Sequence, residues 1–371
     1  MRFATVFLLL IILTGGPAVL AAEALPADPE NALYLDLDAG RVIIRMRPDL
    51  APNHVARIKH LVRAGFYDGL PFHRVIDGFM AQAGDPAGKG AGGTGRTLKA
   101  EFTNTAQMRG TVSMARGSSK NGADSQWFIV LTDANRKALD GKYTMWGQVT
   151  QGVEFVDMIH KGDAARDGAV QTPDHVVRLQ VAADADGVTA VAANAAIAAK
   201  DFSAGEFRCL AFDRPGAQDQ AAVAPLWAHG YLSGAYRAQG TLAFAAADDT
   251  LTPAARAACA ASPQALLLTI TKSHLAKTPR ELPGAMPSFA LAAFTCRMYA
   301  GAGADKTLTD FANLWALAFI QGYKNVVQPD AEISYDARPV LLKAIAGACA
   351  KNPEIGFANL MSAVAAKVKI K

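Results

Sequence analysis

Residues 72–82 read Phe-His-Arg-Val-Ile-Asp-Gly-Phe-Met-Ala-Gln, and they place one fixed cation and one amide among apolar side chains. Alternate residues of a strand point to opposite faces, so Arg74, Phe79 and Gln82 cannot all share one face of a single strand. The Asp-Gly pair between them therefore predicts a turn or bulge that re-aims the later residues. An arginine beside aromatic and amide groups indicates binding of a neutral polar backbone rather than acid–base chemistry. Taken alone, the stretch is equally compatible with a strand that carries a surface arginine.

The composition is that of a globular protein long enough for two or more domains. The chain has 371 residues, of which 51% are hydrophobic and 19% charged, and its net charge is +4. This balance calls for neither nucleic acid nor an anionic membrane surface as a partner.

The N-terminus has the order of a secretory signal peptide. Arg2 precedes an apolar run over residues 3–13, and the small residues 18–22 follow. We assign residues 1–22 to the signal, expect cleavage between residues 21 and 24, and expect export to the periplasm. The run is short for a membrane span, although an uncleaved anchor is the alternative. No later stretch is apolar and long enough to cross a bilayer, so we expect no membrane span in the mature chain.

Short strands dominate residues 31–182. The predicted strands share alternating apolar residues and flanking turn residues, and they cover 33–38, 41–46, 110–116 and 125–131. Residues 139–147 predict a turn and a further strand. Helices are predicted at 52–62, where apolar residues form one stripe, and at 153–159. Many short strands with two helices predict a closed antiparallel barrel.

Two features of this region invite functional interpretations that the sequence does not favour. Residues 84–95 form a glycine-rich loop that contains the formal dinucleotide pattern Gly-x-Gly-x-x-Gly. That pattern needs a helix N-terminus after it, and residues 96–102 have no helical period, so we expect a flexible surface loop. His54 and His60 are expected to be solvated or capping groups rather than ligands.

Together these motifs resemble the cyclophilin family of peptidyl-prolyl isomerases. The motifs that carry the likeness stand in the family's order at 72–85, 110–115, 125–129 and 139–142. The likeness spans roughly residues 32–182. It implies a closed eight-stranded antiparallel β-barrel capped by two helices, with the site on one outer face and with no cofactor and no metal.

The resemblance makes Arg74 the catalytic residue, for a reason that elementary chemistry supports. An X-Pro amide loses its double-bond character on twisting, against a barrier of about 18–20 kcal/mol. The twisted proline nitrogen regains a lone pair, so a donor aimed at it stabilises the twisted state more than the planar one. A guanidinium suits this task because it stays charged.

The resemblance also assigns the substrate-binding residues, which are Phe79, Met80, Gln82, Ala115, Arg116, Gln126, Phe128, Leu139 and Tyr143. The pocket for the proline ring comprises Phe79, Met80, Phe128 and Leu139. Gln82 would hold the substrate carbonyl, while Gln126 and the backbone at 115–116 would orient the peptide. His73 is expected to pack or to orient its neighbours. The apolar members have a plain alternative as core residues.

Three positions depart from the common family pattern. Ala138 stands where cyclosporin-sensitive members carry tryptophan, which implies weak cyclosporin binding. Tyr143 stands where many eukaryotic members have histidine, and it looks like the bacterial periplasmic branch. Arg116 stands where asparagine is common, but the family uses backbone atoms there. These departures put inhibitor sensitivity in doubt rather than the reaction.

The second half of the chain lacks the strand pattern of the first half. An alanine-rich linker at 183–200 leads into an internal repeat. Residues 207–209, 226–235 and 258–259 match 294–296, 314–323 and 348–349, at offsets of 87 to 90 residues. The repeat predicts two all-α modules, at 201–278 and 288–371, each with a tryptophan helix between two cysteines. Trp227, Tyr231 and Gly234 fall on one helix face, where the glycine would let another helix approach closely.

All four cysteines lie in this half, and an even number in an exported chain favours disulfides. The repeat predicts the pairs Cys209–Cys259 and Cys296–Cys349, although four cysteines allow three connectivities. Closing a loop of about 50 residues would stabilise each module by roughly 4 kcal/mol. No Cys-x-x-Cys occurs, so a redox-active or zinc-ribbon site is not favoured.

The modules resemble, through cysteine spacing and a few aromatic positions, the HdeA-like periplasmic acid-stress chaperones. The alternative is a disulfide-braced interaction domain without catalysis. We expect Trp227 and Trp315 to be core residues rather than ligand platforms. The leading interpretation of the whole chain is an exported peptidyl-prolyl isomerase acting on Pro-containing segments of unfolded proteins. The helical repeat would add client or partner binding. The alternative is a non-catalytic periplasmic chaperone or scaffold that grips such segments.

Overall fold

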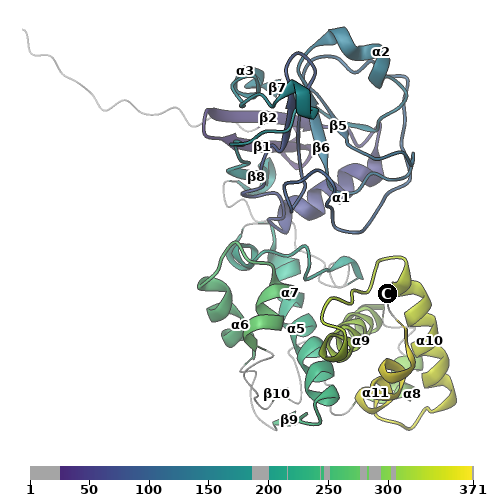
Figure 1. Ribbon diagram of the computed structural model, residues 1–371. Helices are drawn as coiled ribbons and strands as arrows, with labels where there is room; N and C mark the ends of the chain where they lie inside the picture. The colour runs from purple at the N-terminus through teal and green to yellow at the C-terminus, as the bar shows by residue number, and fades with distance from the viewer. Residues whose placement is uncertain are drawn as a thin grey trace, which may run out of the picture.

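The computed structural model describes residues 26–185, 200–214, 216–242, 244–245, 251–275, 282–283, 294–301 and 306–369. The predicted signal at 1–22 and most of the predicted linker at 183–200 lie outside these residues. Figure 1 shows a strand-rich body from the first half of the chain and a helical body from the second. None of the described helices has the length and apolar character needed to cross a membrane.

The sheet body is built on one eight-stranded antiparallel sheet (Figure 1). Its strands are β1 (Ala32–Leu37), β2 (Gly40–Met46), β3 (Arg74–Ile76), β4 (Met80–Ala83), β5 (Thr111–Met114), β6 (Trp127–Val130), β7 (Met145–Gln151) and β8 (Arg178–Val181). Their order in space is β3-β4-β6-β5-β7-β2-β1-β8. The ladder of the described residues ends at β3 and β8, so closure into a barrel stays a prediction.

Strand alternation separates the core of this sheet from its outer face. Ala81 and Ala83 of β4 join the main core, as do Trp127 and Ile129 of β6. Met80, Phe128 and Val130 form a separate apolar cluster on the opposite face. The turn predicted at the Asp-Gly pair is confirmed, because Gly78 has φ +64° and Phe79 N–H donates to the Ile76 carbonyl at 3.0 Å.

Three helices flank the sheet, namely α1 (Pro52–Arg63), α2 (Arg136–Leu139) and α3 (Val153–Asp157). The apolar stripe predicted for α1 is confirmed, since Val55, Ile58 and Leu61 are buried. The expectation that His54 is a solvated or capping group was wrong. It lies one turn before Ile58 on the same stripe, is fully buried, and places Nδ1 2.6 Å from Glu101.

The helical body contains α5 (Gln218–Ala238), α6 (Leu251–Ala260), α7 (Leu267–Ile270), α8 (Cys296–Gly301), α9 (Lys306–Val327), α10 (Ala337–Lys351), α11 (Phe357–Lys367) and the short strands β9 (Phe244–Ala245) and β10 (Leu282–Pro283). The close helix approach expected at Gly234 is confirmed, because a Cβ there would collide with the Phe319 carbonyl oxygen of α9. Trp227 and Trp315 are core residues, as expected.

Two disulfides brace the helical body. Cys209–Cys259 ties a one-turn helix at Cys209–Asp213 to α6, and Cys296–Cys349 ties α8 to α10. These are the pairs that the repeat predicts. In both cases the Cα atoms lie 4.8 Å apart.

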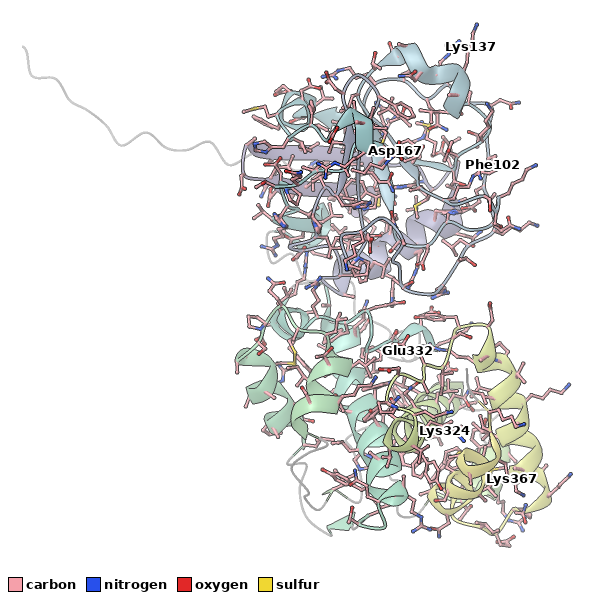
Figure 2. The ribbon with its side chains drawn as sticks, in the orientation of Figure 1. Phe102, Lys137, Asp167, Lys324, Glu332 and Lys367 are labelled. Atoms are coloured by element: carbon pink, nitrogen blue, oxygen red, sulfur yellow. A yellow bond between two sulfur atoms is a disulfide. The ribbon has the colours of Figure 1, made fainter. Side chains whose placement is uncertain are left out.

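The two bodies meet along α1 and the segments around residues 206 and 335, and Glu332 lies on the helical side of this boundary (Figure 2). Arg57 of α1 donates from Nη1 and Nη2 to the two carboxylate oxygens of Glu206, at 2.9 and 2.5 Å. Both side chains are only 2% exposed. A second buried pair joins Arg214 Nη1 to Asp68 at 2.6 Å. The boundary is therefore held by buried, hydrogen-bonded charges.

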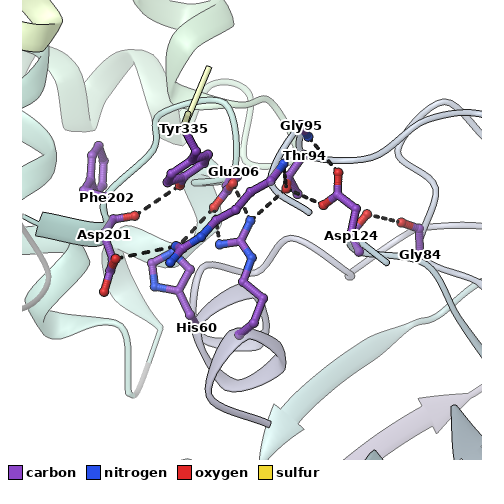
Figure 3. A network of polar contacts seen from close by, with 12 residues as sticks. His60, Gly84, Thr94, Gly95, Asp124, Asp201, Phe202, Glu206 and Tyr335 are labelled. Carbon is purple, nitrogen blue, oxygen red and sulfur yellow. Dashed lines mark hydrogen bonds and ion pairs between the residues drawn. The ribbon is translucent and has the colours of Figure 1, made fainter. Parts of the chain in front are cut away.

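Figure 3 shows the polar network around Glu206. Burial alone would raise the pKa of Glu206, but the hydrogen bond from His60 and the Arg57 charge outweigh it and lower the pKa to about 2. The folded pKa thus lies below the ordinary value of 4.5. The stabilisation from this carboxylate is therefore present above about pH 4.5 and is lost as the pH falls towards 2.

We predict that Arg57→Met lowers the free energy of unfolding by about 3–5 kcal/mol, because it leaves the Glu206 charge buried without its partner. Adding Glu206→Leu should recover most of this loss, since the double variant buries no charge. Urea titrations followed by circular dichroism measure both effects. As a control, Arg297→Met breaks the exposed pair with Glu354 and should cost less than about 1 kcal/mol. Equal costs for the buried and exposed variants would contradict this account of the boundary.

Candidate active site

Arg74 lies in a row of side chains on the outer face of the sheet. Arg74 of β3 pairs in register with Gln82 of β4, and Gln82 pairs with Phe128 of β6. Residues paired across neighbouring strands point to the same face, so a cation, an amide and an aromatic ring stand side by side. Arg74 Nη1 donates to Gln82 Oε1 at 3.1 Å and lies 3.9 Å from Met80 Sδ.

Asp167 fixes the other side of this guanidinium. Arg74 Nε donates to the Asp167 carbonyl oxygen and Nη2 to its Oδ1, both at 2.9 Å. The hydrogen bond and the charge of Arg74 lower the pKa of the Asp167 carboxyl. Sequence reasoning missed Asp167. The sequence did contain a local signal, because Asp167-Gly168 is an Asp-Gly pair like Asp77-Gly78, and such pairs favour turns. In the structure Asp167 has φ +54°.

Gln82 in turn depends on Gln126 and on the glycine-rich loop. Gln82 Nε2 donates to Gln126 Oε1 at 2.8 Å, and Gln126 Nε2 donates to the carbonyls of Gly90 and Gly92 at 3.1 and 2.7 Å. Asp85 accepts backbone N–H bonds from within the loop, including that of Ala87 at 2.8 Å. The loop lies at the surface, as expected, and hydrogen bonds join it to the site.

A pocket with an apolar floor opens beside Arg74. Met80, Phe128 and Leu139 of the outer cluster line it, together with Phe79, Ala115 and Tyr143, which pack against that cluster. The cavity has a volume of about 600 Å³. The rings of Phe128 and Tyr143 meet edge to face with centroids 5.5 Å apart, which makes one wall rigid.

Two polar residues support that wall. Gln107 is buried and donates to the carbonyls of Leu139 and Tyr143 at 3.2 and 3.1 Å, while its Oε1 accepts from Ser113 at 2.7 Å. Arg116 donates to the Lys142 carbonyl at 3.0 Å, and its guanidinium lies 4.9 Å from the Tyr143 ring centroid. The supporting role of Gln107 had no local sequence signal.

The structure brings the predicted site residues together. Nine of them line the cavity, namely Arg74, Phe79, Met80, Gln82, Ala115, Arg116, Phe128, Leu139 and Tyr143. Gln126 lines an adjoining hollow. His73 also borders the cavity, and its burial lowers the pKa of the imidazole, which favours the neutral ring. Within the described lining no Ser, Thr or Cys stands beside a base, so the arrangement offers a directed cation and an apolar notch.

Comparisons with known proteins match the sheet body. The family model described as cyclophilin type peptidyl-prolyl cis-trans isomerase/CLD matches residues 33–181. A "Probable peptidyl-prolyl cis-trans isomerase" from Brucella suis is 47% identical over an alignment of 179 residues, and the match covers 45% of this chain and 89% of that protein. "Peptidyl-prolyl cis-trans isomerase B" from Bacillus subtilis is 39% identical over 144 residues, which cover 38% of this chain and 99% of that protein.

Solved structures give similar matches. Cyclophilin AquaCyp293 from Hirschia baltica is 28% identical, with 42% of this chain and 74% of that chain covered and a TM-score of 0.36. A Cryptosporidium parvum cyclophilin type peptidyl-prolyl cis-trans isomerase, determined in the presence of the dipeptide Ala-Pro, is 25% identical. That match covers 40% of this chain and 98% of that chain, with a TM-score of 0.38. By its sequence relatives and its matched family model, this chain belongs to the cyclophilin-type peptidyl-prolyl cis-trans isomerase family.

Proposed function

We propose that this peptidyl-prolyl isomerase acts on exported client proteins and that its helical body adds a surface for clients or for a protein partner. The observation that carries the catalytic part is the Arg74 guanidinium, which Asp167 and Gln82 hold at the edge of an apolar pocket. A cation held on two sides needs little reorganisation when the reaction starts.

Binding would place the proline ring among the apolar residues of the pocket. Gln82 uses one amide hydrogen on Gln126 and has a second for a substrate carbonyl, because a primary amide carries two donors. The peptide would thus be held at the ring and at a neighbouring carbonyl. Rotation can then proceed about the bond between them.

Arg74 would act on the twisted state. In the planar amide the proline nitrogen shares its lone pair with the carbonyl and is a poor acceptor, whereas at 90° the lone pair is localised. A hydrogen bond from Arg74 to that nitrogen therefore forms mainly in the transition state and lowers the barrier. No proton is transferred to or from the substrate in this scheme.

Three further points belong to the same proposal. The two disulfides support an oxidising compartment outside the cytoplasm, such as the periplasm. Equivalent backbone bridges, Arg208 with Leu266 and Thr295 with Gly356, support two tandem modules. Closure of the eight-stranded sheet into a barrel, as in the family, completes the proposal. The likeness of the modules to HdeA-like chaperones stays a prediction.

We predict that Arg74→Ala lowers kcat/KM for a Pro-containing peptide by about 10²-fold or more, because it removes the donor for the twisted nitrogen. A protease-coupled isomerisation assay on the full chain measures this loss. Lys89→Ala is the matched control: it removes a cation that lines the same cavity but is not part of the Arg74 hydrogen-bond network, and it should keep most of the activity. Activity of Arg74→Ala close to that of the wild type would overturn the assignment and favour a non-catalytic scaffold.

We predict that kcat/KM is flat between about pH 7.5 and 9 for a substrate without ionisable groups. Burial lowers the pKa of His73 below its ordinary value of 6.5, Arg74 lowers the pKa of Asp167 below 3.8, and a guanidinium stays protonated. The charges around the cavity that these groups carry are therefore constant over that range. A pH–rate profile with a midpoint between 6.5 and 8 would show instead that a titrating group takes part.

A further inference from the structure

The catalytic cavity continues into a second hollow that both bodies line. This hollow has a volume of about 630 Å³. It shares five lining residues with the catalytic cavity, Gln82, Gly90, Ala91, Ala115 and Arg116, so the two form one groove. The remaining lining comes from the sheet body with one exception, Glu332, which lies between α9 and α10 of the helical body (Figure 2).

The backbone on both sides of Glu332 is fixed. The Ala331 carbonyl accepts hydrogen bonds from Gln321 and Asn325, and Ile333 N–H donates to Gln321 Oε1 at 2.7 Å. A little further on, the Tyr335 ring lies 4.6 Å from the Arg96 guanidinium of the sheet body. These contacts hold residue 332 at the groove while its side chain stays exposed.

The other charged side chains of the hollow make their hydrogen bonds elsewhere and do not pair with the Glu332 carboxylate. Among the described residues, no Lys, Arg or His lies within ion-pair distance of it. Asp124 accepts from Thr94 Oγ1 at 2.5 Å and from Gly95 N–H at 2.8 Å. Arg116, the cation of the lining, donates to the carbonyls of Lys142 and Gly117. The hollow therefore presents a negative group to whatever lies in the groove.

We propose that Glu332 is a specificity-determining residue, which makes the isomerase favour proline segments that carry Lys or Arg close to the proline. This inference rests on the proposed function of the adjoining cavity. An extended peptide advances about 3.3 Å per residue, so a long basic side chain two or three residues from the proline reaches the second hollow. The helical body thereby contributes a residue to the substrate groove.

The test uses the full chain and peptides that differ in one residue. Lys, Gln or Glu is placed two or three residues before the proline in one series and after it in another, and kcat/KM is measured at low ionic strength. An exposed ion pair predicts that, in one of the two series, the Lys peptide exceeds the Gln peptide by about two- to fivefold. This preference should disappear in Glu332→Gln and weaken in high salt. Asp330→Asn is the matched control, because it removes the same charge two residues away without lining the groove, and it should keep the preference.

An equal Lys preference in the wild type and in Glu332→Gln would overturn the inference, as would no Lys preference in the wild type. The Gln peptide separates these results from a failure of the proposed function. If the wild type does not isomerise the Gln peptide at all, the isomerase proposal itself fails. If it does, and Glu332→Gln isomerises it equally well, any change with the Lys peptide reports on specificity alone.

Discussion

The buried ion pair between Arg57 and Glu206 is the interaction on which the arrangement of this molecule depends. Neither charge is tolerated inside the protein without the other, so the pair exists only while the helical body lies against α1. The same guanidinium also donates to Thr94 at 2.8 Å, and Thr94 donates to Asp124. One side chain thus joins the helical body and the glycine-rich loop (Figure 3).

The glycine-rich loop connects this ion pair to the candidate active site through hydrogen bonds. Its carbonyls at Gly90 and Gly92 orient Gln126, which orients Gln82, which in turn holds one side of Arg74. Hydrogen bonds and one stretch of loop backbone therefore connect Glu206 to the Arg74 guanidinium. The second body shapes the groove from two directions, through this network and through Glu332 at its edge. The geometry of the groove therefore depends on contact between the sheet body and the helical body.

Local patterns in the sequence predicted the parts of the structure that are local in origin. The strand pattern, the amphipathic face of α1 and the turn at Gly78 follow from residue spacing, and the structure shows each of them. The site residues were identified through the resemblance of short motifs to a known family, and the structure brings these motifs together on one face of the sheet and in the loops beside it. The close approach at Gly234 followed from helix periodicity in the same way.

What the sequence could not predict are the partners that distant segments supply. Asp167 is 93 residues from Arg74, and Glu206 is 149 residues from Arg57. No periodicity links a charge to a partner so far away, and for the same reason the sequence did not predict the burial of His54 or the hydrogen bonds of the glycine-rich loop. Each depends on a contact from another segment: Glu101 for His54, and Gln126 for the loop.

The central claim is that Arg74 acts through a positioned donor in the twisted state and not through binding alone. Exchange spectroscopy by NMR on a proline peptide measures binding and isomerisation on the bound peptide separately, in the wild type and in Arg74→Lys. Lysine keeps the charge but loses the planar fork that Asp167 and Gln82 hold. The account predicts that Arg74→Lys binds the peptide but exchanges its cis and trans forms far more slowly. Exchange at the wild-type rate in that variant would contradict it.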